Sequence, residues 1–408
     1  MMRFIQLVIL AMYFSVLSSF AQHMRDSIPY YNRKLRLEEI NFVSGYYRQD
    51  GNNSAVTGGI GTQNLADASG VIDIKLSKYD KKYRNHSLDI KLGIDDYTSA
   101  SSAHIGHIEG LDDVLSAASR HDRRIYPSVT WSVNNPKSGL TYGLTGYYSH
   151  EYHYESRGLG LEFSQLSRDQ NREFSFKGKV YLDTWADILP VELRPPGYGS
   201  GNVDDPTPID HSPRNSFSTL FLLSQVINRR MQVALIAEPS YQHGLLAIKI
   251  HRVYFIDGSE KVENLPNSRY KLPISLRTNY FLTDRVIIRS FYRFYVDNWG
   301  INAHTAELEV PFKITPFFSV SPFYRLHMQH GTRYFAPYGM HTIDEPFYTS
   351  DYDLSTMTSN YLGGNVRIAP PRGILGWNHL NAIELRYGHY LQSNGLNADS
   401  FGLGLTWR

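Results

Sequence analysis

The sequence predicts an all-β protein, a transmembrane barrel of antiparallel strands that closes on itself. Three observations favour this fold class: apolar and polar residues alternate over many segments of about ten residues, short and long connections alternate between these segments, and the last predicted strand carries a polar-x-Gly-x-x-apolar-x-aromatic pattern. Backbone polar groups in lipid must all be paired. A chain that spans a membrane without long apolar helices therefore has only the closed barrel available.

The amino terminus is predicted to be a secretory signal peptide. Arg3 gives it a positive start, residues 4–17 are largely apolar, and Ser19-Phe20-Ala21 forms a small-x-small cleavage site. The apolar stretch is shorter than the roughly 20 residues that span a bilayer, which argues against an anchor. We assign residues 1–21 to the signal peptide, 22–37 to a periplasmic segment and 38–408 to the barrel.

The first hairpin shows the alternation clearly. Ile72, Ile74 and Leu76 alternate with Asp73, Lys75 and Ser77, and a polar turn leads to a second strand in which Leu88, Ile90 and Leu92 alternate with Asp89 and Lys91. An antiparallel register centred on that turn places Asp73 opposite Lys91 and Lys75 opposite Asp89. We expect the apolar set to face lipid and the charged set to face the lumen.

Connection lengths set the strand count, because bacterial barrels have short periplasmic turns and longer outer loops. Short turns are predicted at 78–85, 135–139, 167–172, 228–230, 283–284, 315–316 and 370–378. Long outer connections are predicted at 48–70, 96–125, 185–215, 242–268 and 329–358, with shorter tips near His150, Trp299 and Asn394. If residues 248–255, strand-like in themselves, belong to an outer loop, about sixteen strands result, with fourteen as the alternative. We expect the long outer loops to plug the lumen in part.

The last strand carries a signal typical of outer-membrane barrels. Ser400, Gly402, Leu405 and Trp407 form a polar-x-Gly-x-x-apolar-x-aromatic pattern at the end of the chain. We interpret it as the assembly signal that closes the barrel, and the barrel-assembly machinery is then an expected partner.

Composition excludes several functions. The 408 residues include 41 Lys and Arg against 39 Asp and Glu, a formal charge of only +2, so no strong overall field attracts nucleic acid. The chain has no cysteine, which removes disulfides, thiolate metal sites and thiol catalysis. The strongest bias is the 30 tyrosines.

A ladder of charged residues is predicted on the lumen side. Besides the first hairpin, alternation places Arg289 and Arg293 inward, with Glu307 and Glu309 on the next strand and Arg289 opposite Glu309. Later strands add inward charges at Arg325, Glu384 and Arg386. Such a ladder either keeps a polar interior neutral and rigid or forms a constriction that selects solutes by charge.

Carboxylates in the predicted outer loops are the other candidate binding residues. They are Asp50, Asp95, Asp96, Asp351 and Asp353, which could bind a hard cation or sugar hydroxyls, although solvated rim loops also explain them. Residues 49–54 begin like a calcium loop, but Ala55 stands where the turning glycine is needed and Gly61 where the closing glutamate is needed. We predict no metal site and no cofactor.

An enzyme is the least favoured interpretation. The sequence contains no G-x-S-x-G, H-E-x-x-H or P-loop motif. His304 and His327 are the candidate general bases, but the chain has 16 histidines, so a histidine near a carboxylate carries little weight.

Several blocks together resemble a Gram-negative family of outer-membrane barrel proteins catalogued as a domain of unknown function. The blocks are residues 47–51, 56–62, 95–102, 292–295, 303–305, 321–325, 334–338 and 349–354. The resemblance implies a barrel in the outer membrane and supplies no catalytic residues. We therefore predict a channel for small polar solutes or ions, embedded in outer-membrane lipid. The alternatives are a non-conducting platform that binds other envelope proteins and, third, a barrel enzyme.

Overall fold

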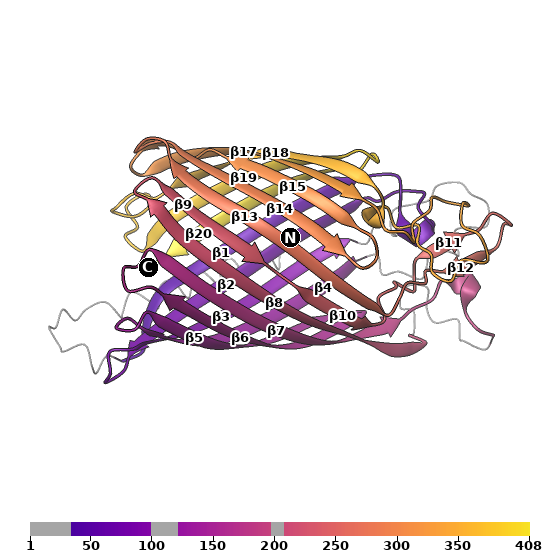
Figure 1. Ribbon diagram of the computed structural model, residues 1–408, viewed down its shortest axis with the longest axis horizontal. Helices are drawn as coiled ribbons and strands as arrows, with labels where there is room; N and C mark the ends of the chain where they lie inside the picture. Colours follow the sequence, from indigo (N-terminus) through magenta and orange to yellow (C-terminus); the bar gives the residue numbers. More distant parts are fainter. Residues whose placement is uncertain (1–33, 99–120, 197–207) are drawn as a thin grey trace.

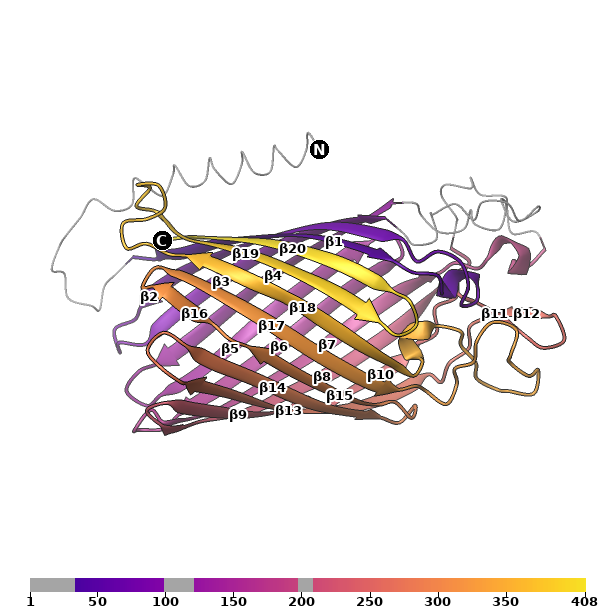
Figure 2. The same cartoon turned by 90° about the horizontal axis from the view of Figure 1, so that it is seen from above.

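The computed structural model describes residues 34–98, 121–196 and 208–408. Within these ranges, strands tilt around a closed cylinder, with short turns at one end and long connections at the other (Figures 1 and 2). The predicted signal peptide and most of the 22–37 segment lie outside the described residues. In the same ranges no helix is long and apolar enough to cross a membrane.

The wall of the barrel begins two residues before the predicted boundary, at Arg36. Its strands are β1 (Arg36–Asp50), β2 (Leu65–Tyr79), β3 (Asn85–Thr98), β4 (His121–Asn135), β5 (Leu140–Glu151), β6 (Tyr154–Leu166), β7 (Arg172–Asp187), β8 (Asp210–Asn228), β9 (Met231–Ala237), β10 (Ser240–Gly244), β13 (Ser268–Phe281), β14 (Ile287–Asp297), β15 (Asn302–Glu309), β16 (Phe312–Thr315), β17 (Phe318–His330), β18 (Met357–Ile368), β19 (Leu380–Gln392) and β20 (Asn397–Trp407). Outside the wall lie β11 (Arg252–Tyr254), β12 (Glu260–Val262) and the single 3-10 turns η3 (Ala55–Thr57), η6 (Val191–Leu193) and η7 (Tyr352–Leu354).

These segments make sixteen membrane strands, as predicted. β9 and β10 both pair with β8 and β13, and together they form one strand interrupted at Glu238-Pro239. β15 and β16 both pair with β17 and are interrupted at Val310-Pro311. Proline has no N–H to donate, so the strand is interrupted there, while the register is the same on both sides of each interruption. The carbonyls of Pro239 and Pro311 still accept backbone hydrogen bonds, so the wall stays paired.

The sheet has no free edge because its first and last strands meet. β1 pairs with β2 on one side and with β20 on the other, so that Gly45 lies opposite both Ser69 and Gly402. Each predicted short turn and long connection coincides with a break between these strands, although several strands extend a few residues into it, and of residues 248–255 only Arg252–Tyr254 is strand, outside the wall. The alternating pattern therefore identified the topology correctly.

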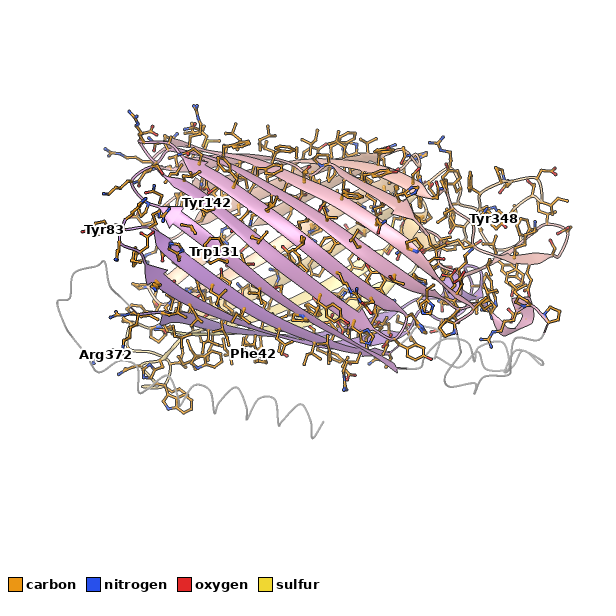
Figure 3. All side chains as sticks on the ribbon, turned by 90° about the horizontal axis from the view of Figure 1, so that it is seen from below. Phe42, Tyr83, Trp131, Tyr142, Tyr348 and Arg372 are labelled. Carbon is orange, nitrogen blue, oxygen red and sulfur yellow. The ribbon has the colours of Figure 1, made fainter. Side chains whose placement is uncertain are left out.

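The outer face of the wall is apolar. Leu159, Leu161 and Leu362 are 65%, 61% and 61% exposed. Trp131 and Tyr142 lie toward the short-turn end, whereas Tyr348 lies at the opposite end, beyond the wall (Figure 3). An exposed apolar band with aromatic residues toward its margin is the surface that a membrane barrel presents to lipid. The chain is thus a transmembrane barrel.

The inner face carries aromatic rings that lie over glycines of neighbouring strands. A Cβ on Gly93 would come within 2.1 Å of the Tyr126 ring, and one on Gly388 would come within 2.4 Å of the Tyr361 hydroxyl. Glycine at these positions lets the rings lie flat against the wall instead of filling the lumen.

The long connections fold together into a cap at the end of the barrel opposite the short turns (Figure 2). We define the cap as residues 51–64, 188–196, 245–267 and 331–356. Its buried core includes Val253, Phe255 and Tyr348. The buried Arg252 joins three of these segments, since it forms a salt bridge with Glu192 and its Nη1 donates to the Val56 carbonyl at 2.7 Å. The cap is therefore a packed structure with its own core.

Candidate functional site in the barrel lumen

The short-turn half of the lumen contains a polar pocket of about 570 Å³. Its charged lining comes from five of the predicted ladder positions, on β14, β15 and β17, and from Arg277 of β13. These residues are Arg277, Arg289, Arg293, Arg325, Glu307 and Glu309. Four arginines face two glutamates, so the pocket has a formal excess of two positive charges. We call it the arginine pocket.

Two of these arginines are neutralised by ion pairs across neighbouring strands. Arg289 Nη1 lies 3.1 Å from Glu309 Oε1, and Arg325 Nη2 lies 2.6 Å from Glu307 Oε2. The register puts Arg289 opposite Glu309 and Glu307 opposite Arg325. Both guanidinium groups remain nearly half exposed to the lumen, so these pairs are solvated and contribute little to stability.

The other two arginines have no carboxylate partner. In the part of the chain that the structure describes, no carboxylate lies within salt-bridge distance of Arg277 or Arg293. Each guanidinium instead lies 5.9 Å from the Phe291 ring centroid, a distance typical of a weak cation–π contact. Both positive charges are thus available to a solute.

Sequence reasoning missed Arg277, although the signal was present. Leu272, Ile274 and Leu276 of β13 are exposed on the outer face, and the same alternation points Arg277 inward.

The remaining ladder residues lie elsewhere along the wall. Asp73 and Lys91 form a salt bridge at 3.4 Å, and Lys75 lies opposite Asp89 in the register but is 3.8 Å from Glu38. Glu384 pairs with Arg367 at 3.1 Å, and Arg386 stacks 4.6 Å from the Phe323 ring centroid. Glu38 and Arg367 are partners that the sequence did not suggest.

A second pocket of about 480 Å³ lies toward the cap and shares Arg325 with the arginine pocket. Its wall is rich in hydroxyl and amide groups, among them Tyr47, Tyr361, Tyr390 and Ser400. The cap contributes Gln63 and Asp353. We call it the tyrosine pocket. The two pockets together outline a polar route along the lumen, with the cap above it.

The predicted loop carboxylates do not form one group. Asp50 ends β1 opposite Asn397, and only Asp351 and Asp353 lie in the cap, where Asp351 caps η7 and Asp353 lies within it. Placing Asp95 and Asp96 in a loop was wrong, since both belong to β3 and accept hydrogen bonds from Arg124 and Arg123 of β4, at 2.7 and 2.6 Å. The strand extends further because these cross-strand pairs stabilise its polar end.

The two candidate bases are separated by the wall. His304 faces outward, where its Nδ1 is 2.7 Å from the Tyr292 hydroxyl, whereas His327 Nδ1 is 2.8 Å from the Thr305 hydroxyl on the lumen side. They cannot act together on one substrate.

The predicted assembly signal occupies the closing strand. Ser400 and Gly402 face the lumen, where the Ser400 hydroxyl is 2.8 Å from that of Tyr361, and Leu405 and Trp407 alternate with them. β20 holds both β19 and β1, so this segment joins the two ends of the sheet.

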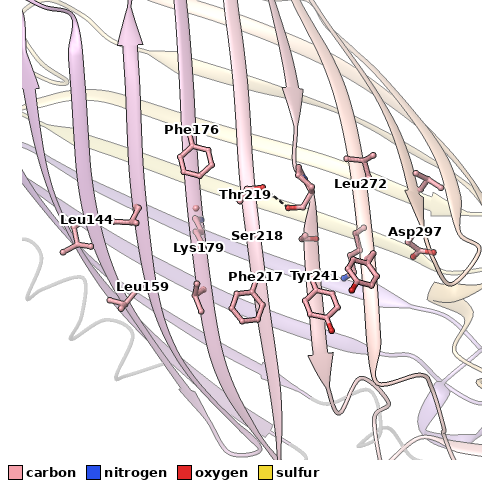
Figure 4. Close-up of a pocket in the computed structure, with 18 residues that line it drawn as sticks. Leu144, Leu159, Phe176, Lys179, Phe217, Ser218, Thr219, Tyr241, Leu272 and Asp297 are labelled. Atoms are coloured by element: carbon pink, nitrogen blue, oxygen red, sulfur yellow. Dashed lines mark hydrogen bonds between the residues drawn. The ribbon is translucent and has the colours of Figure 1, made fainter.

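An apolar groove of about 940 Å³ lies on the lipid side of the wall (Figure 4). Leu144, Leu159, Phe176, Phe217 and Tyr241 line it. Such a surface suits acyl chains and not a polar solute, so the two lumen pockets are the better candidate site.

Comparison with known proteins identifies the family but no activity. The chain has 7% sequence identity to "Pseudomonas Aeruginosa OpdK with Vanillate" over 90% of this chain and 97% of that one, with a TM-score of 0.42. A BenF-like porin from Pseudomonas fluorescens Pf-5 gives 8% identity over 93% of this chain and 100% of that one, with a TM-score of 0.43. Similarity of this size says nothing about a shared activity. No curated protein matches the sequence. A family model matches residues 95–393, and the chain therefore belongs to the family described as "Protein of unknown function (DUF3570)".

Proposed function

We propose that the protein is a channel for small polar solutes in the outer membrane of a Gram-negative bacterium, with a preference for anions. The observation that carries this proposal is the pair of lumen arginines, Arg277 and Arg293, without carboxylate partners. A pore lined by unpaired positive groups raises the local concentration of anions and lowers that of cations.

We propose further that the cap controls the access of solutes to the lumen. Gln63 and Asp353 from the cap line the tyrosine pocket, and Gln329 Nε2 of β17 donates to the Asp353 carbonyl at 2.9 Å. A solute entering from the long-loop end would pass these groups before it reaches the arginine pocket. Movement of the cap would then open or close the route, and outer-membrane lipid and the barrel-assembly machinery remain the expected partners.

The test is single-channel recording of the purified protein in planar bilayers under a KCl gradient. We expect stepwise conductance and a reversal potential that shows chloride passing more readily than potassium. The double variant Arg277→Ala and Arg293→Ala should lower this preference by about twofold or more, because a unit charge at 4 Å is worth about 1 kcal/mol even in water. Lys137→Ala, in the short turn between β4 and β5, removes a charge outside the pocket and is the matched control.

A second candidate, a non-conducting platform for envelope partners, is favoured by the packed core of the cap. The absence of any conductance from protein that has folded and inserted into the bilayer would support this candidate. Conductance without anion preference, or a preference unchanged in the double variant, would contradict the role we give to the arginines. We do not propose an enzyme, since His304 and His327 lie on opposite faces of the wall.

A further inference from the structure

Three side chains of metal-ligand type converge inside the cap, away from the lumen pockets. They are His251, Glu263 and Asp351, and one ligand atom of each lies within 4.8 Å of the others. His251 directly precedes β11 and Glu263 directly follows β12, so the hairpin register brings them together, and the Glu263 N–H donates to the His251 carbonyl at 2.9 Å. Asp351 comes from the separate 331–356 segment.

A buried threonine holds the two segments in this arrangement. The fully buried Thr349 hydroxyl donates to Glu263 Oε1 at 2.5 Å and accepts from the Asp351 backbone N–H at 3.0 Å. Glu263 Oε2 accepts from the Ile248 N–H at 2.7 Å. The carboxylate of Glu263, which is only 2% exposed, is therefore fixed in place before any ligand binds.

The cluster contains more negative charge than the surrounding protein compensates. The ligand atoms of the two carboxylates and the imidazole lie within 4.8 Å of one another, with Glu263 buried and the other two partly buried. Even if the imidazole carries a proton, two carboxylates face one positive charge, and an uncompensated charge in such a place is costly.

One ligand atom in the cluster has no hydrogen-bond partner. His251 Nδ1 is buried and unsatisfied, and it lies 3.6 Å from Glu263 Oε1, beyond hydrogen-bonding distance. Two ligands that are each about 2.0–2.2 Å from one ion lie roughly 3–4 Å apart. A cation between the two atoms would satisfy the nitrogen and neutralise the carboxylates together.

We propose that His251, Glu263 and Asp351 bind a divalent transition-metal ion such as Zn²⁺ or Mn²⁺. One imidazole with two carboxylates suits these ions, whereas calcium and magnesium select all-oxygen sites. The ion would tie the 245–267 segment to the 331–356 segment. Because Asp351 caps η7, whose Asp353 lines the tyrosine pocket, the ion would also fix the cap above the lumen. The site is independent of whether the barrel conducts.

The test is calorimetric titration with Zn²⁺ and, separately, with Ca²⁺. The protein is the full barrel in detergent, without a histidine tag and treated with a chelator beforehand. We expect one Zn²⁺ per chain in the wild type and no matching response to Ca²⁺. Asp351→Asn and His251→Gln each remove a direct ligand. Removing a residue that only supports a ligand already weakens metal binding by about tenfold or more, so each of these variants should weaken zinc binding by at least about tenfold. Asp257→Asn, at the far tip of the same hairpin, removes an exposed carboxylate and should bind like the wild type.

X-ray absorption of the zinc-loaded wild type provides a readout that does not require a folded variant. One imidazole nitrogen together with carboxylate oxygens is expected, and a shell of several imidazoles would place the zinc at other histidines and reject the site. A wild type that binds no zinc, or variants that fold and bind as tightly as Asp257→Asn, would also overturn the proposal.

Discussion

At the scale of single residues, Asp80 organises the short turn between β2 and β3. Its Oδ1 accepts from the N–H groups of Lys82 and Arg84 at 2.8 and 3.0 Å, and its Oδ2 accepts from Arg84 Nε at 2.7 Å. Desolvation is the largest single influence on the pKa of Asp80 and raises it, but the hydrogen-bond donors together outweigh it and hold this pKa well below its usual value. The ionised carboxylate is thus part of the turn.

This lowered pKa predicts a pH-dependent effect of Asp80→Asn. A carboxyl whose pKa is depressed on folding contributes stability above its unfolded pKa, about 3.9, and loses that contribution as pH falls through the folded value. The variant should therefore exchange the amide hydrogens of Lys82 and Arg84 faster than the wild type at pH 7, measured by NMR in detergent micelles. The relative difference between the two proteins should shrink as pH is lowered from 4 toward 2. A ratio that is the same throughout that range would contradict the role of the charge.

At the scale of elements, neighbouring strands of the wall fit each other through paired glycines and aromatic rings. Gly93 of β3 lies opposite Tyr126 of β4, and the Tyr126 hydroxyl donates to Asp95 at 2.9 Å. The ring needs the space that a Cβ at position 93 would occupy. Glycine is therefore required here by the neighbouring strand, since it does not have a positive φ.

We expect Gly93→Ala to destabilise the barrel by about 1–3 kcal/mol, the usual cost of overpacking a well-fitted site. The added methyl group would displace the Tyr126 ring and weaken its hydrogen bond to Asp95. Urea unfolding followed by tryptophan fluorescence measures the change. Gly146→Ala is the matched control, because a Cβ at Gly146 meets nothing within 4 Å. Equal midpoints for the two variants would show that the contact is not tight.

Regular elements are also the part of the structure that the sequence predicts best. A period of two residues fixes which side chains face lipid, and pairs such as Asp73 with Lys91 then follow from the position of a turn. The cap has no such period. Its contacts join residues far apart in the chain, as Thr349 joins Glu263, so nothing local indicates that His251 and Asp351 meet. Strand ends are harder to predict, because Asp95 and Asp96 resemble loop residues in sequence and only the structure places Arg124 and Arg123 beside them.

At the scale of the whole molecule, a sequence with mean hydropathy of −0.36 forms a membrane protein because its polar and apolar groups are sorted onto two faces. The lumen holds the ion pairs and the unpaired Arg277 and Arg293 of the arginine pocket, while the outer face exposes leucines and aromatic rings. The pairing of β1 with β20 satisfies the backbone N–H and C=O groups of both edge strands. Lipid has no hydrogen-bonding groups in its hydrocarbon region that could do so.

The sorting predicts unequal losses of stability when the same charge is added to the two faces of one strand. Leu161, near the middle of β6, is 61% exposed on the outer face, whereas Ser164 of the same strand points inward. Leu161→Arg should destabilise the barrel by about 2–4 kcal/mol in lipid bilayers, because an arginine there lies in hydrocarbon. Ser164→Arg should change stability far less, since its guanidinium reaches lumen water beside Thr141 and Ser175. Reversible unfolding from phospholipid vesicles measures both. If Ser164→Arg were as harmful as Leu161→Arg, the interior at that level would have to be dry, and the polar route between the arginine and tyrosine pockets would be lost with it.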